Sequence, residues 1–375
     1  MRDMSVETQG YRAPDRRVLA LVGAAALIFV VGLTWSKWMP YAAKIDVLSG
    51  TRAWEGGALV DTAREASSWW TGAWAFTVAY TEAVWKALLV GLLLAAAIDA
   101  FLPHAWLRRV LGGRGTLTGA ATAGAVSLPS MMCTCCASPV AVSLRRTGVP
   151  TSSAVAYWLG NPVLNPAVLV FLALVGPWQW AATRLAVGIA LVLGAALVAA
   201  WLTGERRTTD TAVLEPDRAR QDGQDGNPLV RFGRSLARLT LTLIPEYLLV
   251  VFLVGAGAHL LAWDAPWLVG GWGVLALAIV ALLMVIPTGG EIPVLLALAA
   301  VGASPWVLGL VLIALPAISL PSLLMVGQTL TWRVGGDRPR RGRGGGRRRG
   351  GAAGPGVGGG RPARLVAELL APRGA

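Results

Sequence analysis

The chain has 375 residues, of which 55% are hydrophobic and 14% are charged, and its mean hydropathy is +0.59. This composition excludes an ordinary soluble globular protein and predicts a chain that crosses the lipid bilayer several times. The net charge of +13 comes mainly from 11 arginines in residues 333–375. This Gly- and Arg-rich tail is predicted to be disordered, and it lacks the interleaved aromatic residues of a nucleic-acid platform. No nucleic acid is therefore expected as a partner. The tail is expected either to contact anionic lipid headgroups or to be solvated without a specific partner.

Apolar segments along the chain predict an all-α polytopic membrane protein with about eight transmembrane helices. A helix needs about 20 apolar residues to cross a bilayer core of roughly 30 Å. The segments that meet this criterion are 17–36, 72–102, 115–147, 151–175, 178–203, 236–262, 267–301 and 304–330. Two of them, 115–147 and 267–301, are predicted to be broken or re-entrant. The first is longer than the apolar core of an ordinary signal peptide, so it is predicted to be a retained span.

The arginines in the connecting segments predict the orientation. Segments 103–114 and 204–235 are rich in arginine, which is typical of the cytoplasmic side, whereas the charges of 37–71 balance. Both termini are therefore expected in the cytoplasm, and 37–71 is expected outside. Five parts follow: an N-terminal span with its external segment (1–71), a first membrane repeat (72–203), a cytoplasmic linker (204–235), a second membrane repeat (236–332) and the basic tail (333–375).

All three cysteines lie within four positions, at Cys133, Cys135 and Cys136, between Pro129 and Pro139. Each proline removes a backbone donor and clashes with the preceding helical turn, so the backbone is expected to open here. Opened backbone at membrane depth is tolerated where it lines a cavity or is buried in protein. Clustered thiols select soft, thiophilic ions, and Cys133 and Cys135 are the predicted metal ligands. Plain packing of small apolar thiols and a disulfide relay are the alternatives.

An internal repeat relates the two membrane segments. With a shift of 154 residues, Pro139, Gly148 and Pro162 coincide with Pro293, Gly302 and Pro316. With a shift of 164, Glu82 and Gly91 coincide with Glu246 and Gly255. If both broken elements are re-entrant, the positive-inside bias favours an inverted repeat, whereas crossing elements would give a parallel one.

Broken helices of inverted repeats form the substrate sites of secondary transporters. The same breaks therefore predict the site in this chain: the cysteine run, the segment 161–166 with two Asn-Pro pairs, the segment 287–293, and the segment 316–321. The candidate binding residues besides the cysteines are Asn161, Asn165, Glu291 and Ser319. The two asparagines could instead satisfy carbonyls that prolines leave free, and Glu291 could cap a helix.

Two carboxylates inside predicted spans, Glu82 and Glu246, are candidates for coupling transport to a proton or cation, because ionisable groups at membrane depth are expensive. Lys86 lies one turn after Glu82, so a structural ion pair is the alternative there.

The sequence has no nucleotide-binding or aspartyl-phosphate motif and no soluble segment large enough for an ATPase. Ion-coupled or facilitated transport by a protein that is not an enzyme and needs no cofactor is therefore expected. Homo-oligomerisation stays open.

Several segments taken in order resemble the predicted permease family that contains the ArsP-type organoarsenical efflux permeases. They are Leu-Pro-Ser-Met-Met-Cys-Thr-Cys-Cys-Ala-Ser-Pro-Val, Leu-Arg-Arg-Thr-Gly, Gly-Asn-Pro-Val-Leu-Asn-Pro and, in the second copy, Ala-Leu-Pro-Ala-Ile-Ser-Leu-Pro-Ser, within residues 72–330. The resemblance implies a permease of the bacterial inner membrane, with Cys133 and Cys135 at the family's Cys-x-Cys positions. For one branch it also implies export of trivalent organoarsenicals recognised through thiols.

Two functional hypotheses follow. The first is a permease that exports a soft solute such as a trivalent organoarsenical or a metal ion. The second is a membrane thiol-disulfide oxidoreductase that uses the same cysteines.

Overall fold

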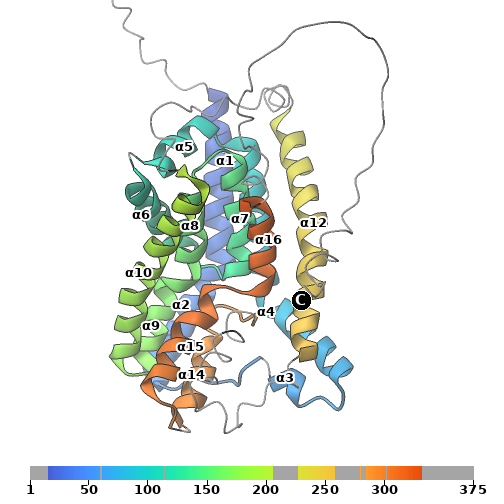
Figure 1. Ribbon diagram of the computed structural model, residues 1–375. Coiled ribbons are helices and arrows are strands. Elements are labelled where there is room, and N and C mark those ends of the chain that lie inside the picture. Colours follow the sequence, from blue (N-terminus) through green and yellow to red (C-terminus); the bar gives the residue numbers. More distant parts are fainter. Residues whose placement is uncertain are drawn as a thin grey trace, which may run out of the picture. The chain divides into compact units, whose positions relative to one another are not determined.

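The structure is a computed structural model, and it describes residues 16–59, 61–113, 115–205, 227–257, 279, 284–300 and 302–331. For residues 328–331 it describes the backbone alone. Every regular element in these ranges is helical (Figure 1). The predictions for the basic tail and for most of the linker 204–235 lie outside the described residues. The same holds for most of 258–283, where the predicted span 236–262 ends and the predicted span 267–301 begins. The described residues belong to one unit that ends at Gly336.

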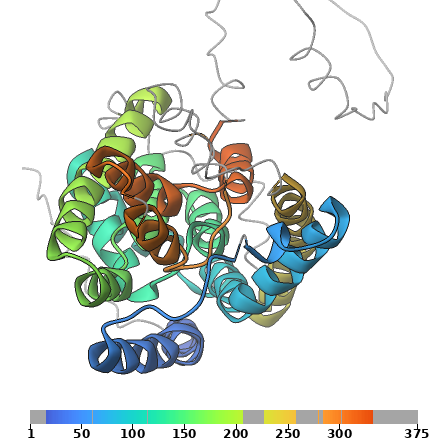
Figure 2. The same cartoon turned by 90° about the horizontal axis from the view of Figure 1, so that it is seen from below.

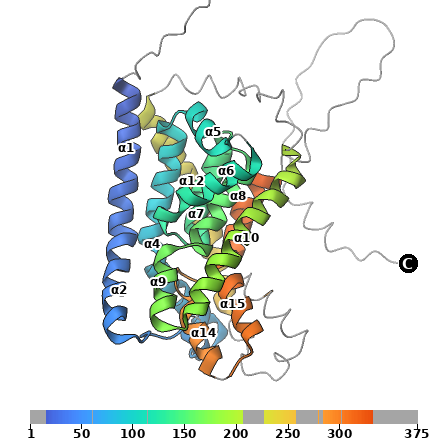
Figure 3. The same ribbon diagram turned by 90° about the vertical axis from the view of Figure 1, so that its left-hand side faces the viewer.

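The first span is longer than predicted. It is one apolar helix from Arg16 to Thr51, composed of α1 (Arg16–Leu33), a π-helical turn η1 (Thr34–Trp38) and α2 (Met39–Thr51). Figures 2 and 3 show this helix at the margin of the bundle. The predicted end at residue 36 was wrong because the helix runs on through Lys37 and Lys44. The side chain of Lys37 is buried, and the ammonium of Lys44 lies over the Trp54 ring, 4.1 Å from its centroid.

Two long helices pack against each other, and the first of them also packs against α1. They are α4 (Trp69–Phe101), which begins with a capping box between Ser68 and Thr71, and α12 (Pro228–Gly257). Because α12 begins at Pro228, the connection that precedes it is shorter than the predicted linker. The short helices α3 (Asp61–Arg64) and α5 (His104–Gly112) flank α4 in the chain.

The first broken element consists of α6 (Thr116–Ser127), a 3₁₀ turn η2 (Leu128–Ser130) and α7 (Thr134–Arg146). The prediction of opened backbone is confirmed for the beginning of the cysteine run, and it was wrong for the end, since α7 passes through Pro139. A second interruption follows between α8 (Thr151–Val163) and α9 (Pro166–Val175), and α10 (Trp178–Thr203) then packs along α8.

Some helix boundaries of the second half coincide with those of the first. Its helices are α14 (Glu291–Ala300), α15 (Pro305–Ala317) and α16 (Leu320–Thr331). Shifted by 154 residues, α8 coincides with α15 at both ends, and the first residue of α9 falls on the first residue of α16. Gly148 and Gly302, also related by this shift, both have positive φ, 89° and 76°. In Figure 1, α8 lies above α9, whereas α15 lies below α16.

In the described part of the chain, five helices are long and apolar enough to cross a membrane, or six if the bent pair α15–α16 counts as one span. The sequence predicted about eight. One of the other two, 115–147, is made of short helices joined by opened backbone, and the other, 267–301, lies partly outside the described residues. The described part of the chain is thus all-helical, and its long apolar helices are those of a multi-pass membrane protein.

Candidate functional site

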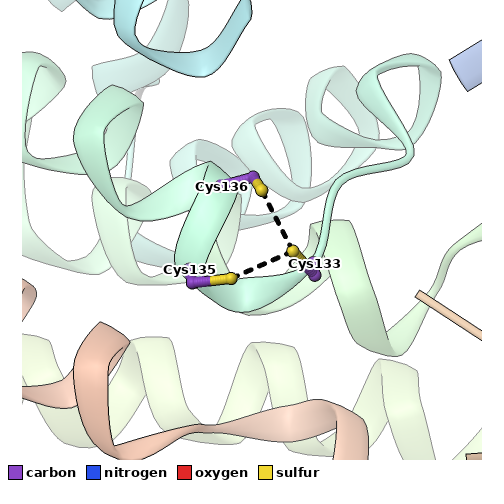
Figure 4. Close-up of side chains that lie close together, drawn as sticks. All are labelled: Cys133, Cys135 and Cys136. Atoms are coloured by element: carbon purple, nitrogen blue, oxygen red, sulfur yellow. Dashed lines mark hydrogen bonds between the residues drawn. The ribbon is translucent and has the colours of Figure 1, made fainter. Parts of the chain in front are cut away.

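The three thiols converge at the start of α7. Cys133 lies on the extended residues before the helix, at its N-cap position, and Cys135 and Cys136 lie in its first turn (Figure 4). The Sγ atom of Cys133 is 3.1 Å from that of Cys135 and 3.1 Å from that of Cys136. All three are buried free cysteines.

The loop before the cysteines is held by Asn161 of α8. Its side-chain oxygen accepts hydrogen bonds from the Ser130 hydroxyl and, at 3.3 Å, from the backbone N–H of Met132. Its side-chain nitrogen donates to the Tyr157 carbonyl, 2.9 Å away. Met131 adopts a left-handed conformation with φ of 47°, which is unfavourable for a residue with a side chain. Asn161 is therefore placed to fix the backbone that presents the thiols.

The break between α8 and α9 is organised by Asn165 and Arg184. Pro166 has no N–H to offer the carbonyl of Pro162, and the Ala167 N–H donates instead to the side-chain oxygen of Asn165, at 3.0 Å. The carbonyls of Pro162 and Val163 accept from the guanidinium of Arg184 on α10, at 2.8 and 3.0 Å. The freed carbonyls are thus satisfied by Arg184, and Asn165 has a role that was not predicted, since it caps the N-terminus of α9.

Arg184 also binds Glu291, with an N···O distance of 2.5 Å, and both side chains are almost completely buried. Sequence reasoning missed Arg184. It is the one charged residue of α10, so the argument that singled out Glu82 and Glu246 would have found it as well. The ion pair connects α10 of the first half with the first residue of α14 in the second half.

A small cavity lies where the breaks meet, with room for about one water molecule. It is lined by residues from all four predicted segments and their neighbours: Cys133, Thr134, Pro162, Ile286, Pro287, Thr288, Glu291, Leu315, Pro316 and Ser319. The thiol of Cys133 and the carboxylate of Glu291 therefore belong to walls contributed by different halves. Ser319 of the second half contacts the wall formed by the first half, since its hydroxyl is 3.1 Å from that of Thr134.

The other candidate residues lie around this cavity or away from it. Asn161 and Asn165 are buried behind its wall and are used by the backbone, as described above. Glu82 is exposed on α4, and Glu246 is half-buried on α12. Lys86 lies near the rings of Trp35 and Trp85, and a Glu82–Lys86 ion pair is absent from the described part of the chain. The structure thus gathers the cysteines, Glu291 and Ser319, and it leaves the two predicted coupling carboxylates outside the cavity lining.

Chemically, the site offers three sulfur ligands that can meet at one centre, since all three Sγ atoms lie within 4.8 Å of one another. Two or three soft ligands on one side of a low-polarity cavity suit a thiophilic centre better than a hard cation. The hydroxyls of Thr134, Thr288 and Ser319 add neutral hydrogen-bonding groups.

Comparison with known proteins agrees with this architecture. The sequence pattern of the ArsP_1 family, described as a predicted permease, matches residues 69–334. The chain is also 39% identical over 312 residues to the UPF0718 protein YraQ of Escherichia coli (strain K12), which covers 80% of this chain and 85% of that protein. No solved structure matches. The chain belongs to the ArsP_1 family of predicted permeases.

Proposed function

We propose that the chain is a secondary transporter that exports a soft, thiophilic solute, such as a trivalent organoarsenical or a soft metal ion, held by Cys133, Cys135 and Cys136. The observation that carries this proposal is the convergence of three free thiols beside a cavity formed by two broken elements. Membership of a permease family supports transport, and neither the family nor the relative supports the oxidoreductase alternative.

Binding of such a solute is a ligand exchange without oxidation or reduction. A trivalent arsenical of the form R–As(OH)₂ exchanges its two As–O bonds for two As–S bonds. The two thiol protons leave with the hydroxides as two molecules of water. Cys133 and Cys135, whose Sγ atoms are 3.1 Å apart, supply the two sulfurs, and Cys136 lies beside them, 3.1 Å from Cys133. The narrow cavity has to widen for an organic group to enter, as alternating access requires.

The two halves form an inverted repeat in this proposal. The coincidence of helix boundaries under the shift of 154 residues supports a duplicated unit. The opposite order of α8 and α9 compared with α15 and α16 supports the inversion (Figure 1). An inverted pair gives two similar gates on opposite sides of one site, which is the arrangement that alternating access needs.

Expression in an arsenical-sensitive bacterial host tests the proposal. We expect the chain to raise tolerance to trivalent phenyl- and methylarsenicals and to lower cellular arsenic, and we expect Cys135→Ser to abolish both effects because one thiol of the site is lost. Immunoblotting of membranes confirms equal expression of the variant. Thr122→Ser on α6, outside the cavity lining, is a control substitution. Unchanged tolerance together with unchanged cellular arsenic would contradict the arsenical assignment.

A further inference from the structure

One buried charge beside the cavity has no role in the function proposed above. Lys37 lies in the helix Arg16–Thr51, most of whose side chains face away from the bundle, yet it is only 7% exposed. The π-helical turn η1 (Thr34–Trp38) changes the rotation of the helix at this point and ends with a bond from the Met39 N–H to the Thr34 carbonyl. Such turns occur frequently at functional sites.

The same turn of helix contacts both broken elements. The Trp38 indole donates to the Pro129 carbonyl at 2.8 Å, and the Tyr41 hydroxyl donates to the Met131 carbonyl at 3.4 Å, so both hold the loop that leads to the cysteines. The Lys37 ammonium donates to the hydroxyl of Thr288 at 3.4 Å. Because Thr288 and Cys133 line the same cavity, Lys37 lies directly behind its wall.

The charge of Lys37 is not balanced by a carboxylate. Its ammonium has three N–H groups, and its hydrogen-bond partners are two neutral hydroxyls, those of Thr288 and of Tyr41 at 2.9 Å. No carboxylate among the residues that the structure describes forms an ion pair with Lys37. A cation buried at membrane depth is costly without an anionic partner. The ionisable groups that interact electrostatically with Lys37 are Tyr41, Cys133 and Cys136.

We propose that Lys37 forms a cationic subsite for an anionic group carried by the solute, a carboxylate or a phenolate on its organic part. The inference rests on the proposed function. Binding of the trivalent centre converts the thiols into uncharged sulfur bonds to that centre, so the bound sulfurs provide no counter-ion and the ammonium needs an anion from elsewhere. A solute that joins a soft centre to an acidic organic group satisfies the thiols and Lys37 together. Lys37 then determines which thiophilic solutes are preferred.

Equilibrium binding to the purified full chain in lipid nanodiscs tests this subsite. The probes are phenylarsonous acid and 4-carboxyphenylarsonous acid, which differ only by the carboxylate, and bound arsenic is measured after separation of free probe. We expect the carboxylated probe to bind at least about tenfold more tightly, as for other close charge pairs. Lys37→Met should remove this preference and leave the affinity for the uncharged probe unchanged.

Two further variants separate recognition from folding. Lys37→Arg keeps the charge and should keep the preference. Lys44→Met removes a cation of the same helix that lies over Trp54, and it should also keep the preference. Equal binding of the two probes to the unmodified chain, or an equal loss of both affinities in Lys37→Met, would overturn the subsite. Cys135-dependent binding of both probes with equal affinity would leave the proposed function standing, whereas binding of neither probe would contradict both proposals.

Discussion

Arg184 is a buried cation whose partners come from both halves of the chain. Its guanidinium is fully buried and serves two backbone carbonyls of the α8–α9 break as well as the carboxylate of Glu291. A buried ion pair is not in itself strongly stabilising, but removal of one partner leaves a charge without compensation. The pair is therefore expected to lock the two halves together in this closed conformation.

Glu291→Gln should destabilise the protein by about 3–5 kcal/mol, because Arg184 keeps its charge in a buried site without a counter-ion. Thermal unfolding in detergent, followed by tryptophan fluorescence, measures the effect. The double variant Arg184→Met and Glu291→Met should lose less stability than the sum of the two single replacements by methionine.

Arg64→Gln is the matched control, because its partner Asp61 is 4.0 Å away and both side chains are more than a third exposed. Its cost should stay below about 1 kcal/mol. If Glu291→Gln unfolded at the same temperature as Arg64→Gln, the buried pair would not have the structural role assigned to it.

At the scale of elements, the position of the thiols depends on how closely α4 approaches α7. Gly91 of α4 faces the first turn of α7, and a Cβ atom at this position would lie 2.5 Å from the Cys136 carbonyl oxygen. That atom belongs to the backbone of the turn that carries two of the three cysteines. A larger residue at 91 would therefore move the sulfur ligands.

Gly91→Ala should weaken binding of phenylarsonous acid on the order of 10–100-fold, the usual effect of disturbing the support of metal ligands. Arsenic bound to the purified protein gives the measurement. Gly194→Ala on α10 adds the same methyl group to a helix where nothing lies within 4 Å, and it should bind like the unmodified chain. Equal affinities of the two variants would show that the approach of α4 does not set the thiol geometry.

Much of this arrangement of elements could be predicted from local sequence signals. Apolar length predicted α10 at residues 178–203 without error, and prolines predicted the breaks beside the cysteines and after Pro162. Lys37 was missed because a lysine after an apolar run is typical of a helix end at the membrane surface, and only the three-dimensional packing turns it inward. The roles of the two asparagines were not predicted: Asn161 holds Met132, which lies 29 residues away in the chain, and Asn165 accepts from the N–H of Ala167 at the start of the next helix.

For the whole molecule, the relation between the halves decides the transport mechanism. The inverted repeat predicts that equivalent turns face opposite sides of the membrane. Pro150 and Ser304 are equivalent N-cap residues of α8 and α15. In a background with the three native cysteines replaced by alanine, Pro150→Cys and Ser304→Cys should react with a membrane-impermeant maleimide from opposite sides. Spheroplasts and everted vesicles give the two sides, and denatured protein gives total labelling. Labelling of both positions from one side would require a parallel repeat.

The central claim is that the cysteine site carries the solute across the membrane. The measurement that tests it most directly is uptake of trivalent phenylarsenical into everted membrane vesicles that contain the unmodified chain or the Cys135→Ser variant at equal amounts. The account predicts accumulation with the unmodified chain and only the background of empty vesicles with Cys135→Ser. Equal accumulation by the two proteins would contradict it.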